Sequence, residues 1–254
     1  TDARQLSGAG SLSGAIIGGA MVGIGMVLAR GCASRLLVLS ATGNLRALVT
    51  GLMLTLVAQS ALSGVLAPAR EAISGLWLVS GPSRDLIQSL GLSHSVVMFA
   101  AVIALIVSLG LAYDRGVRPT AALAGVGVGL AVTLGWALTY AISQASFEIV
   151  PVSTVTFTGP STDTLMALVT ERSVPMSFGI GLVPGVFLGA GLAALLAGEW
   201  KIQRFGPDTP MERYFLGAVL MGFGAMLAGG CAVGAAVSGG SVMSLTAWVA
   251  GASI

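Results

Sequence analysis

Apolar runs long enough to cross a bilayer recur along this chain and alternate with short polar connections. About 20 apolar residues span a hydrocarbon core of about 30 Å. The longest runs predict four spanning helices, at 45–67, 94–113, 120–142 and 176–197. The polar connections between and after them lie at 68–93, 114–119, 143–175 and 198–213. This pattern is typical of an all-α polytopic membrane protein.

Two shorter apolar runs are each interrupted by a Gly-Cys pair. The run 13–29 covers only about 25 Å as a helix, and after the break a second short piece, 33–40, follows. The run 213–228 also ends in a Gly-Cys pair, and a stretch of small residues, 232–241, comes next. We therefore expect broken or re-entrant helices at both places, with a further helix beginning at 246–254.

The connections carry weaker signals. Pro68 is expected to end the helix 45–67, since proline removes a backbone donor. A short interfacial helix carrying Trp77 is expected in the connection that follows. Within the polar outer connection 143–175, a short helix at 161–170 is expected, capped by Ser161 or Thr162.

The two Gly-Cys breaks belong to an internal repeat. Residues 23–33 and 222–232 align at an offset of 199 positions, and each holds one of the chain's two cysteines. The aligned identities are Gly23/Gly222, Gly25/Gly224, Leu28/Leu227, Ala29/Ala228, Gly31/Gly230, Cys32/Cys231 and Ala33/Ala232. We predict one transmembrane domain over 1–254, with a first repeat copy at about 13–67 and a second at about 213–254. Because the chain opens at Thr1 and stops inside an apolar run, we expect a fragment that lacks membrane segments.

Composition supports this class and excludes others. The 254 residues are 55% hydrophobic and 9% charged, against about a quarter charged in soluble domains, and the mean hydropathy is +0.94. The formal net charge of +2 gives no reason to expect a nucleic acid partner. The lipid bilayer is the expected surrounding, and 37 glycines suit helices that pack closely within it.

The distribution of Lys and Arg predicts orientation. The connections 114–119 and 198–213 concentrate basic residues, so we place both in the cytoplasm: Arg115, Arg118, Lys201, Arg204 and Arg213. If the first Gly-Cys unit is re-entrant, counting spans makes the two repeat copies parallel. If 13–29 crosses fully and 33–40 does not return, the copies are inverted.

The breaks offer a specific chemistry. Helix ends expose backbone groups without helical partners, and the amides that open the next half-helix favour anions. A pair of Gly-interrupted apolar segments at matching places is a pointer to a transport site. We therefore predict that Gly31, Gly229 and Gly230 expose backbone at the site. The thiols of Cys32 and Cys231, weak donors with polarizable sulphur, would pass along a soft anion with a terminal sulphur. The alternative is that both cysteines only pack helices, as remnants of a duplication.

Two arginines and two serines near the breaks can each be interpreted in two ways. Arg30 and Arg35 flank the first cysteine, where they would attract an anion or extend to the membrane interface. Ser238 and Ser241 follow the second, where they would offer hydroxyls to an anion or form a tight turn. We predict no catalytic, metal or cofactor site, because the two distant cysteines form no metal-type pattern and no phosphate-binding loop is present.

Three stretches carry a family resemblance. Residues 217–234 read Gly-Ala-Val-Leu-Met-Gly-Phe-Gly-Ala-Met-Leu-Ala-Gly-Gly-Cys-Ala-Val-Gly, followed by Ser-Gly-Gly-Ser at 238–241. Residues 157–165 read Phe-Thr-Gly-Pro-Ser-Thr-Asp-Thr-Leu, and 181–189 read Gly-Leu-Val-Pro-Gly-Val-Phe-Leu-Gly. The chain closely resembles the YeeE/YedE family of bacterial inner-membrane sulphur-transport proteins.

The resemblance implies an hourglass-shaped, non-enzymatic transporter of many helices, in which cysteine loops reach the centre. The implied substrate is thiosulfate or a related sulphur species, passed by S–H···S contacts to Cys32 and Cys231. Sulphurtransferase-like partner proteins are implied by the family alone. The family also has a cysteine nearer the N-terminus, to which nothing in this sequence corresponds.

Two other functions stay open. A membrane thiol–disulfide oxidoreductase would pair the two cysteines, although such chemistry favours an exposed thiol with a nearby resolving partner and no CxxC motif is present. A non-transporting helical membrane protein would keep the cysteines as inert structural residues.

Overall fold

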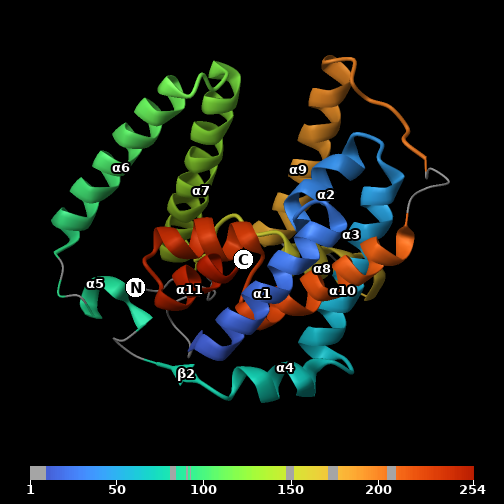
Figure 1. Ribbon diagram of the computed structural model, residues 1–254, viewed down its shortest axis with the longest axis horizontal. Coiled ribbons are helices and arrows are strands. Elements are labelled where there is room, and N and C mark those ends of the chain that lie inside the picture. Colours follow the sequence, from blue (N-terminus) through green and yellow to red (C-terminus); the bar gives the residue numbers. More distant parts are fainter. Residues whose placement is uncertain are drawn as a thin grey trace.

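The computed structural model describes residues 10–80, 84–89, 91, 93–146, 152–170, 177–204 and 210–254. Helices dominate this part of the chain, and six helical stretches in it are long and apolar enough to cross a membrane, which confirms the all-α polytopic class. A two-stranded antiparallel ribbon is the one sheet among the described residues. The elements are α1 (Leu12–Ala29), α2 (Ala33–Ala41), α3 (Leu45–Ser63), α4 (Ala67–Ser74), α5 (Leu86–Ser89), α6 (His94–Asp114), α7 (Pro119–Ala145), α8 (Thr158–Thr170), α9 (Phe178–Leu196), α10 (Met211–Ala228), the π-helix η2 (Val233–Gly239), α11 (Leu245–Ser253), β1 (Gly10–Ser11) and β2 (Leu78–Val79) (Figure 1).

The centre of the fold is the antiparallel pair α1 and α10, which pack through glycines. A Cβ atom on Gly18 would lie 2.6 Å from the backbone oxygen of Gly224, and one on Gly217 would lie 2.8 Å from that of Gly25. The start of α1 therefore meets the end of α10. Gly18 and Gly217 are equivalent in the repeat, as are Gly25 and Gly224, so the two contacts are related by a twofold axis. The repeat copies are inverted, which decides between the two arrangements that the sequence left open.

The same symmetry relates the outer helices of the two copies. Gly222 of α10 packs on α3, where an added Cβ would lie 2.7 Å from the oxygen of Leu54. Its counterpart Gly23 of α1 makes the same contact with the backbone of Ile254, directly after α11. The offset is 199 between the two glycines and 200 between their partners. The second copy is therefore one residue longer than the first after its cysteine.

The π-helix contains that extra residue. α2 has 9 residues, whereas the continuous helix 232–241, with η2 at its centre, is one residue longer. A π-helix forms i→i+5 hydrogen bonds and so takes up a single-residue insertion within a helix. The stretch 232–241 is thus a helix and not merely a run of small residues.

The connection after α3 differs from expectation. α3 ends at Ser63, and Pro68 does not terminate it but lies in the first turn of α4. The first turn of a helix tolerates proline, because the missing N–H would have no helical partner there. Trp77 lies beyond α4 and is 59% exposed, so the short helix does not carry it.

The segment 152–170 also differs from the expected outer loop. Residues 152–157, here called the extended segment, form no helix and, apart from a bridge at Val152, no strand; Val155 and Phe157 in it are buried. α8 then begins at Thr158, so Ser161 and Thr162 lie inside the helix and do not cap it. Thr154, Thr162 and Thr164 of this segment are buried, and each donates its hydroxyl proton to a carbonyl group; Thr154, for example, donates to the oxygen of Val132 on α7 at 2.7 Å.

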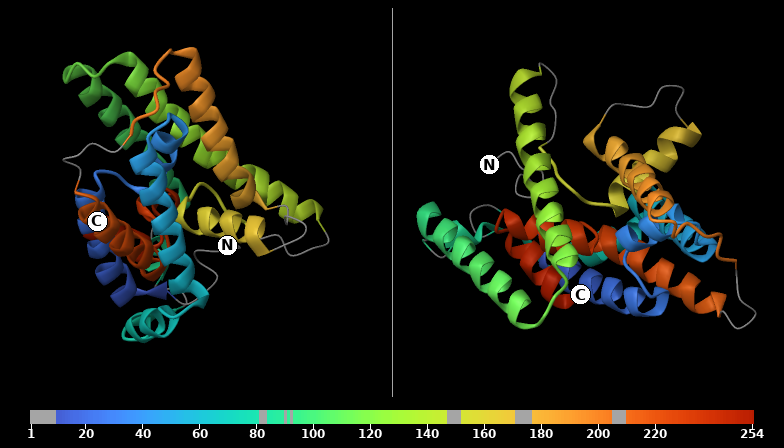
Figure 2. Two further views of the ribbon diagram at one scale, coloured as in Figure 1. Left: turned by 90° about the vertical axis from the view of Figure 1, so that its right-hand side faces the viewer. Right: turned by 90° about the horizontal axis from the view of Figure 1, so that it is seen from above.

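Two basic connections lie at one edge of the molecule. The turn between α6 and α7, with Arg115 and Arg118, and the end of α9, with Lys201 after it, share the upper edge in Figure 1 and in the left view of Figure 2. This common edge is what the distribution of basic residues predicts. Residues 205–209 of the second connection lie outside the described residues.

Candidate functional site

The first Gly-Cys break joins α1 to α2 through a left-handed residue. Arg30 has φ of 56°, and its N–H and that of Gly31 both donate to the oxygen of Met26. The chain is extended at Cys32, and α2 begins at the next residue. The Cys32 side chain is half-buried, with its Sγ 3.1 Å from the hydroxyl of Ser34 on the same helix.

The second break repeats this backbone geometry in different surroundings. Gly229 has φ of 83°, and its N–H and that of Gly230 donate to the oxygen of Ala225. Cys231 is only 3% exposed. Its Sγ accepts the Gly234 N–H at 3.4 Å and lies 3.8 Å from the hydroxyl of Thr156. The extended segment 152–157 therefore covers this cysteine.

Both cysteines open a helix. The oxygen of Cys32 accepts the N–H of Leu36, and the oxygen of Cys231 accepts the N–H of Ala235 at 2.7 Å. Helix geometry leaves the first amides after each cysteine without helical acceptors, and the helix dipole is positive there. Each thiol thus lies where a helix favours an anion.

The two breaks approach a common centre. Cys231 is buried in an apolar cluster with Val132, Val155 and Phe157. Ala33, the residue directly after Cys32, packs against this cluster, as does Leu37 one turn later. Both thiols are free, so the structure contains no disulfide of the kind that an oxidoreductase would form between them.

The arginines of the first break have no equivalent in the second. Arg30 and Arg35 are exposed, and neither forms a hydrogen bond or ion pair with any residue in the described ranges. Gly229 and Gly234 occupy the matching positions. A Cβ atom on Gly234 would collide with the hydroxyl of Thr156, so the second break has no room for an arginine. Attraction of an anion by the arginines stays a prediction.

The two serines after Cys231 form hydrogen bonds within the protein. Ser238 is buried and donates to the oxygen of Val155, which holds the extended segment against η2. Ser241 is exposed, donates to the oxygen of Ser238 at 2.7 Å and accepts from the indole of Trp136 at 3.1 Å. Their hydroxyl protons are used in these contacts, and the tight turn comes only afterwards, at 242–243. Their role as anion ligands stays a prediction.

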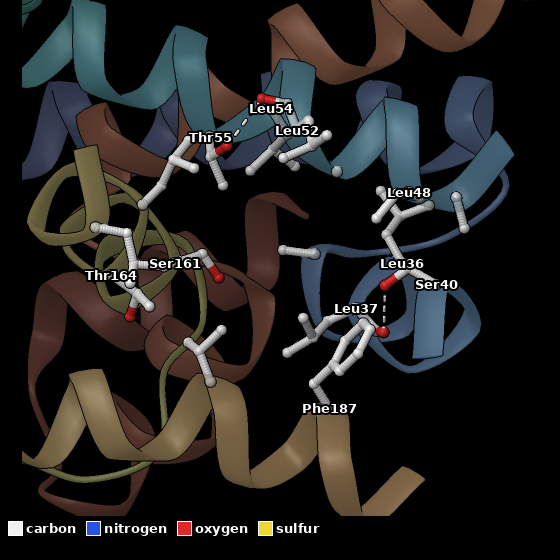
Figure 3. A pocket seen from close by; sticks show the side chains of 16 residues that line it. Leu36, Leu37, Ser40, Leu48, Leu52, Leu54, Thr55, Ser161, Thr164 and Phe187 are labelled. Carbon is white, nitrogen blue, oxygen red and sulfur yellow. Dashed lines mark hydrogen bonds between the residues drawn. The ribbon is translucent and has the colours of Figure 1, made fainter. Parts of the chain in front are cut away.

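A cavity of about 190 Å³ lies between α2, α3, α8 and α9 (Figure 3). Ala33 and Leu37 line it and also contact the Cys231 cluster. Three hydroxyl groups on its wall donate to carbonyls of their own helices: Ser40 to Leu37, Thr55 to Leu52 and Thr164 to Pro160. The wall is therefore apolar and suits a hydrophobic group better than an anion. Sequence patterns gave no sign of this cavity.

Sequence reasoning also missed Thr156 and Thr158. Both lie in a stretch that its polar composition assigned to an outer loop, and Thr156 contacts the Cys231 thiol. The one available signal was the resemblance of residues 157–165 to a family motif, which gave no role to any single residue.

Comparison with known proteins gives consistent results. Residues 3–254 match the sulphur transport family. The chain is 30% identical over 260 residues to the thiosulfate transporter TsuA of Spirochaeta thermophila, a match that covers 94% of this chain and 74% of that protein. It is 32% identical over 122 residues to the thiosulfate transporter TsuA of Escherichia coli, covering 48% of this chain and 32% of that protein.

Proposed function

This chain belongs to the sulphur transport family, and we propose that it takes up thiosulfate or a related sulphur-containing anion across the bacterial inner membrane. The observation that carries the proposal is the pair of cysteines, each at the start of a half-helix and related to the other by the inverted repeat. Inverted repeats with broken helices at matching places commonly form transport sites near the bilayer midplane.

We assign the two thiols a non-covalent role. Each S–H is a weak donor to the terminal sulphur of the anion, while the amides of the half-helix that follows stabilise its negative charge. Arg30 and Arg35 attract the anion to the first break, and the second break offers backbone and neutral side chains. The anion passes between Cys32 and Cys231 without the formation of a bond, so the protein acts as a transporter and not as an enzyme.

The proposal includes sidedness. Connections 114–119 and 198–213 face the cytoplasm, because they concentrate Lys and Arg. A sulphurtransferase-like protein that receives the sulphur would bind on this side. That partner is supported by the family resemblance alone.

Uptake of labelled thiosulfate by full-length protein in proteoliposomes tests the function, with labelled sulfate as the specificity control. Cys32→Ala and Cys231→Ala are each expected to reduce the initial rate at least about tenfold, since each removes a contact made during transfer. Ser34→Ala, which alters only the neighbour of the Cys32 thiol, is the matched control. Wild-type rates in both cysteine variants would exclude the thiol relay, and no uptake by wild-type protein would exclude the function.

A further inference from the structure

One buried hydroxyl stands apart from all others of its type in the described part of the chain. Eight threonines are buried there, and seven of them form a hydrogen bond through the hydroxyl: Thr50, Thr55, Thr139, Thr154, Thr162, Thr164 and Thr246. The eighth, Thr158, is 1% exposed, and its Oγ1 has no partner among the described residues. A buried hydroxyl without a hydrogen-bond partner is unfavourable. A bound ligand that accepts a hydrogen bond from Thr158 would remove this cost.

The position of Thr158 connects it with the second cysteine. It is the first residue of α8, a helix of 13 residues. Phe157, directly before it, belongs to the apolar cluster around Cys231, and Thr156 contacts the Cys231 sulphur. The unpartnered hydroxyl is therefore two residues from a side chain that touches the thiol.

The start of α8 also has the backbone of an anion site. The amides of Thr158 and Gly159 precede the first helical hydrogen bonds, and the helix dipole is positive at this end. Around Gly159 there is open space where a side chain would be, with no heavy atom within 4 Å of an added Cβ. The hydroxyl, the amides and this space thus belong to two consecutive residues at the start of α8.

The face of α8 that carries Thr158 continues into the cavity wall. Ser161 and Leu165 follow it by three and seven positions, which places all three on one side of the helix. Both of these residues line the cavity between α2, α3, α8 and α9. Thr158 thus lies one helical turn before the part of α8 that lines this cavity.

We propose that Thr158 and the N-terminus of α8 bind the oxygen atoms of the transported sulphur oxyanion while its terminal sulphur contacts Cys231. This inference rests on the proposed function and specifies it further. An anion such as thiosulfate has a soft sulphur end and a hard oxygen end, and a hydroxyl with helix amides suits the oxygens. The anion is thereby oriented at the second break. Thr158 selects oxyanions over sulphur species that carry no oxygen, such as hydrosulfide.

The test compares Thr158→Val with Thr158→Ser in full-length protein, measuring thiosulfate KM in proteoliposomes and the melting temperature in detergent. Thr158→Val has nearly the same shape but no hydroxyl, so KM should rise roughly 10- to 100-fold. Because it also removes an unpartnered polar atom, the melting temperature without substrate should rise by about 2–4 °C. Thr158→Ser should keep the wild-type KM.

Thr162→Val is the matched control, since the Thr162 hydroxyl is equally buried and donates to the oxygen of Thr158 at 2.8 Å. It should lower the melting temperature and leave KM unchanged. A wild-type KM in Thr158→Val would overturn the proposal. A lower melting temperature or loss of Thr158→Val protein from the membrane would also overturn it, by showing that the hydroxyl has a structural partner. These outcomes are distinct from a failure of wild-type protein to take up thiosulfate, which contradicts the proposed function itself.

Discussion

The two Gly-Cys breaks share a backbone but differ in nearly everything around it. Each places a cysteine after a left-handed helix end and before a half-helix. The first cysteine is half-buried beside a serine of its own helix, whereas the second is buried under the extended segment 152–157. Inverted symmetry has preserved the geometry that presents the thiol, and substitutions have made one break charged and open and the other neutral and closed.

The left-handed positions show the same divergence. Arg30, with φ of 56°, matches Gly229, and Gly43, with φ of 97°, matches Met243, with φ of 54°. Each copy uses glycine at one of these two positions and a larger residue at the other. L-residues in the left-handed region cost roughly 1–2 kcal/mol. Each copy thus accepts strain at a different end of its half-helix.

The largest expected effect comes from making the second break resemble the first. Gly234→Arg, which introduces the counterpart of Arg35, should abolish folding, because even a Cβ there collides with Thr156. Gly234→Ala should lower stability by about 1–3 kcal/mol. The reverse change, Arg35→Gly, should leave the protein in the membrane. The yield of monodisperse protein in detergent and its melting temperature measure these effects.

Gly240→Ala is the control for these variants. It lies in the same helical stretch at φ of −64°, with no atom within 4 Å of an added Cβ, and should be tolerated. Wild-type yield for Gly234→Arg would show that the second break is not closed by the extended segment.

Thiol accessibility measures the difference between the breaks directly. In single-cysteine variants, Cys32 should react with a small maleimide at least about tenfold faster than Cys231, because reaction requires exposure of the sulphur. Thr156→Ala, which trims the side chain that covers Cys231, should narrow this difference. A gel shift with a second, polymer-linked maleimide counts the thiols that remain. Equal labelling rates of the two single-cysteine variants, with Thr156 intact, would show that the two thiols are equally accessible and contradict this comparison.

Substitutions at the α1–α10 crossing should lower stability equally in the two repeat copies, whereas substitutions at the two breaks should not. Gly18→Ala and Gly217→Ala each place a methyl group against the partner backbone at twofold-related points, so each should cost about 1–3 kcal/mol. Their melting temperatures should fall by similar amounts. Gly127→Ala on α7, with open space around it, is the control. A loss confined to one of the two variants would contradict the inverted twofold relation.

The smallest effects belong to the left-handed positions. Arg30→Gly should stabilise the protein by up to about 1 kcal/mol, because glycine adopts a positive φ without strain. Gly229→Ala should destabilise it by a similar amount. Thermal melting resolves such changes as shifts of about 2–4 °C. If Arg30→Gly also raises the KM for thiosulfate at low salt, the arginine contributes charge to the first break in addition to its strain.

The sequence predicted the breaks because Gly-Cys interruptions in apolar runs too short to span carry their own signal. Counting spans did not fix the direction of the copies, since the outcome depends on whether 13–29 crosses the membrane. Packing fixed it, through Gly18 and Gly217, whose equivalence is visible in the sequence but whose contacts are not.

The sequence did not predict that residues 152–157 cover Cys231, because this contact too depends on tertiary packing. Residues 152–157 contain Thr154 and Thr156, so their composition suggested solvent. Their polar groups are instead satisfied at long range, on α7 and at Cys231. No local pattern records such partners. The Thr158 hydroxyl is exceptional because it lacks a tertiary partner, which no sequence pattern indicates.

The helix after Cys231 is one residue longer than its counterpart after Cys32, yet the helices that follow keep equivalent contacts. In an α-helix one added residue rotates everything that follows by about 100°, which would turn the apolar face of α11 away from α1. The π-helix absorbs that rotation within seven residues, Val233–Gly239. The contact of Gly23 with the end of α11 therefore keeps the phase of its counterpart on α3. The two copies thus differ in the helix directly after the thiol while the surrounding helices remain in register.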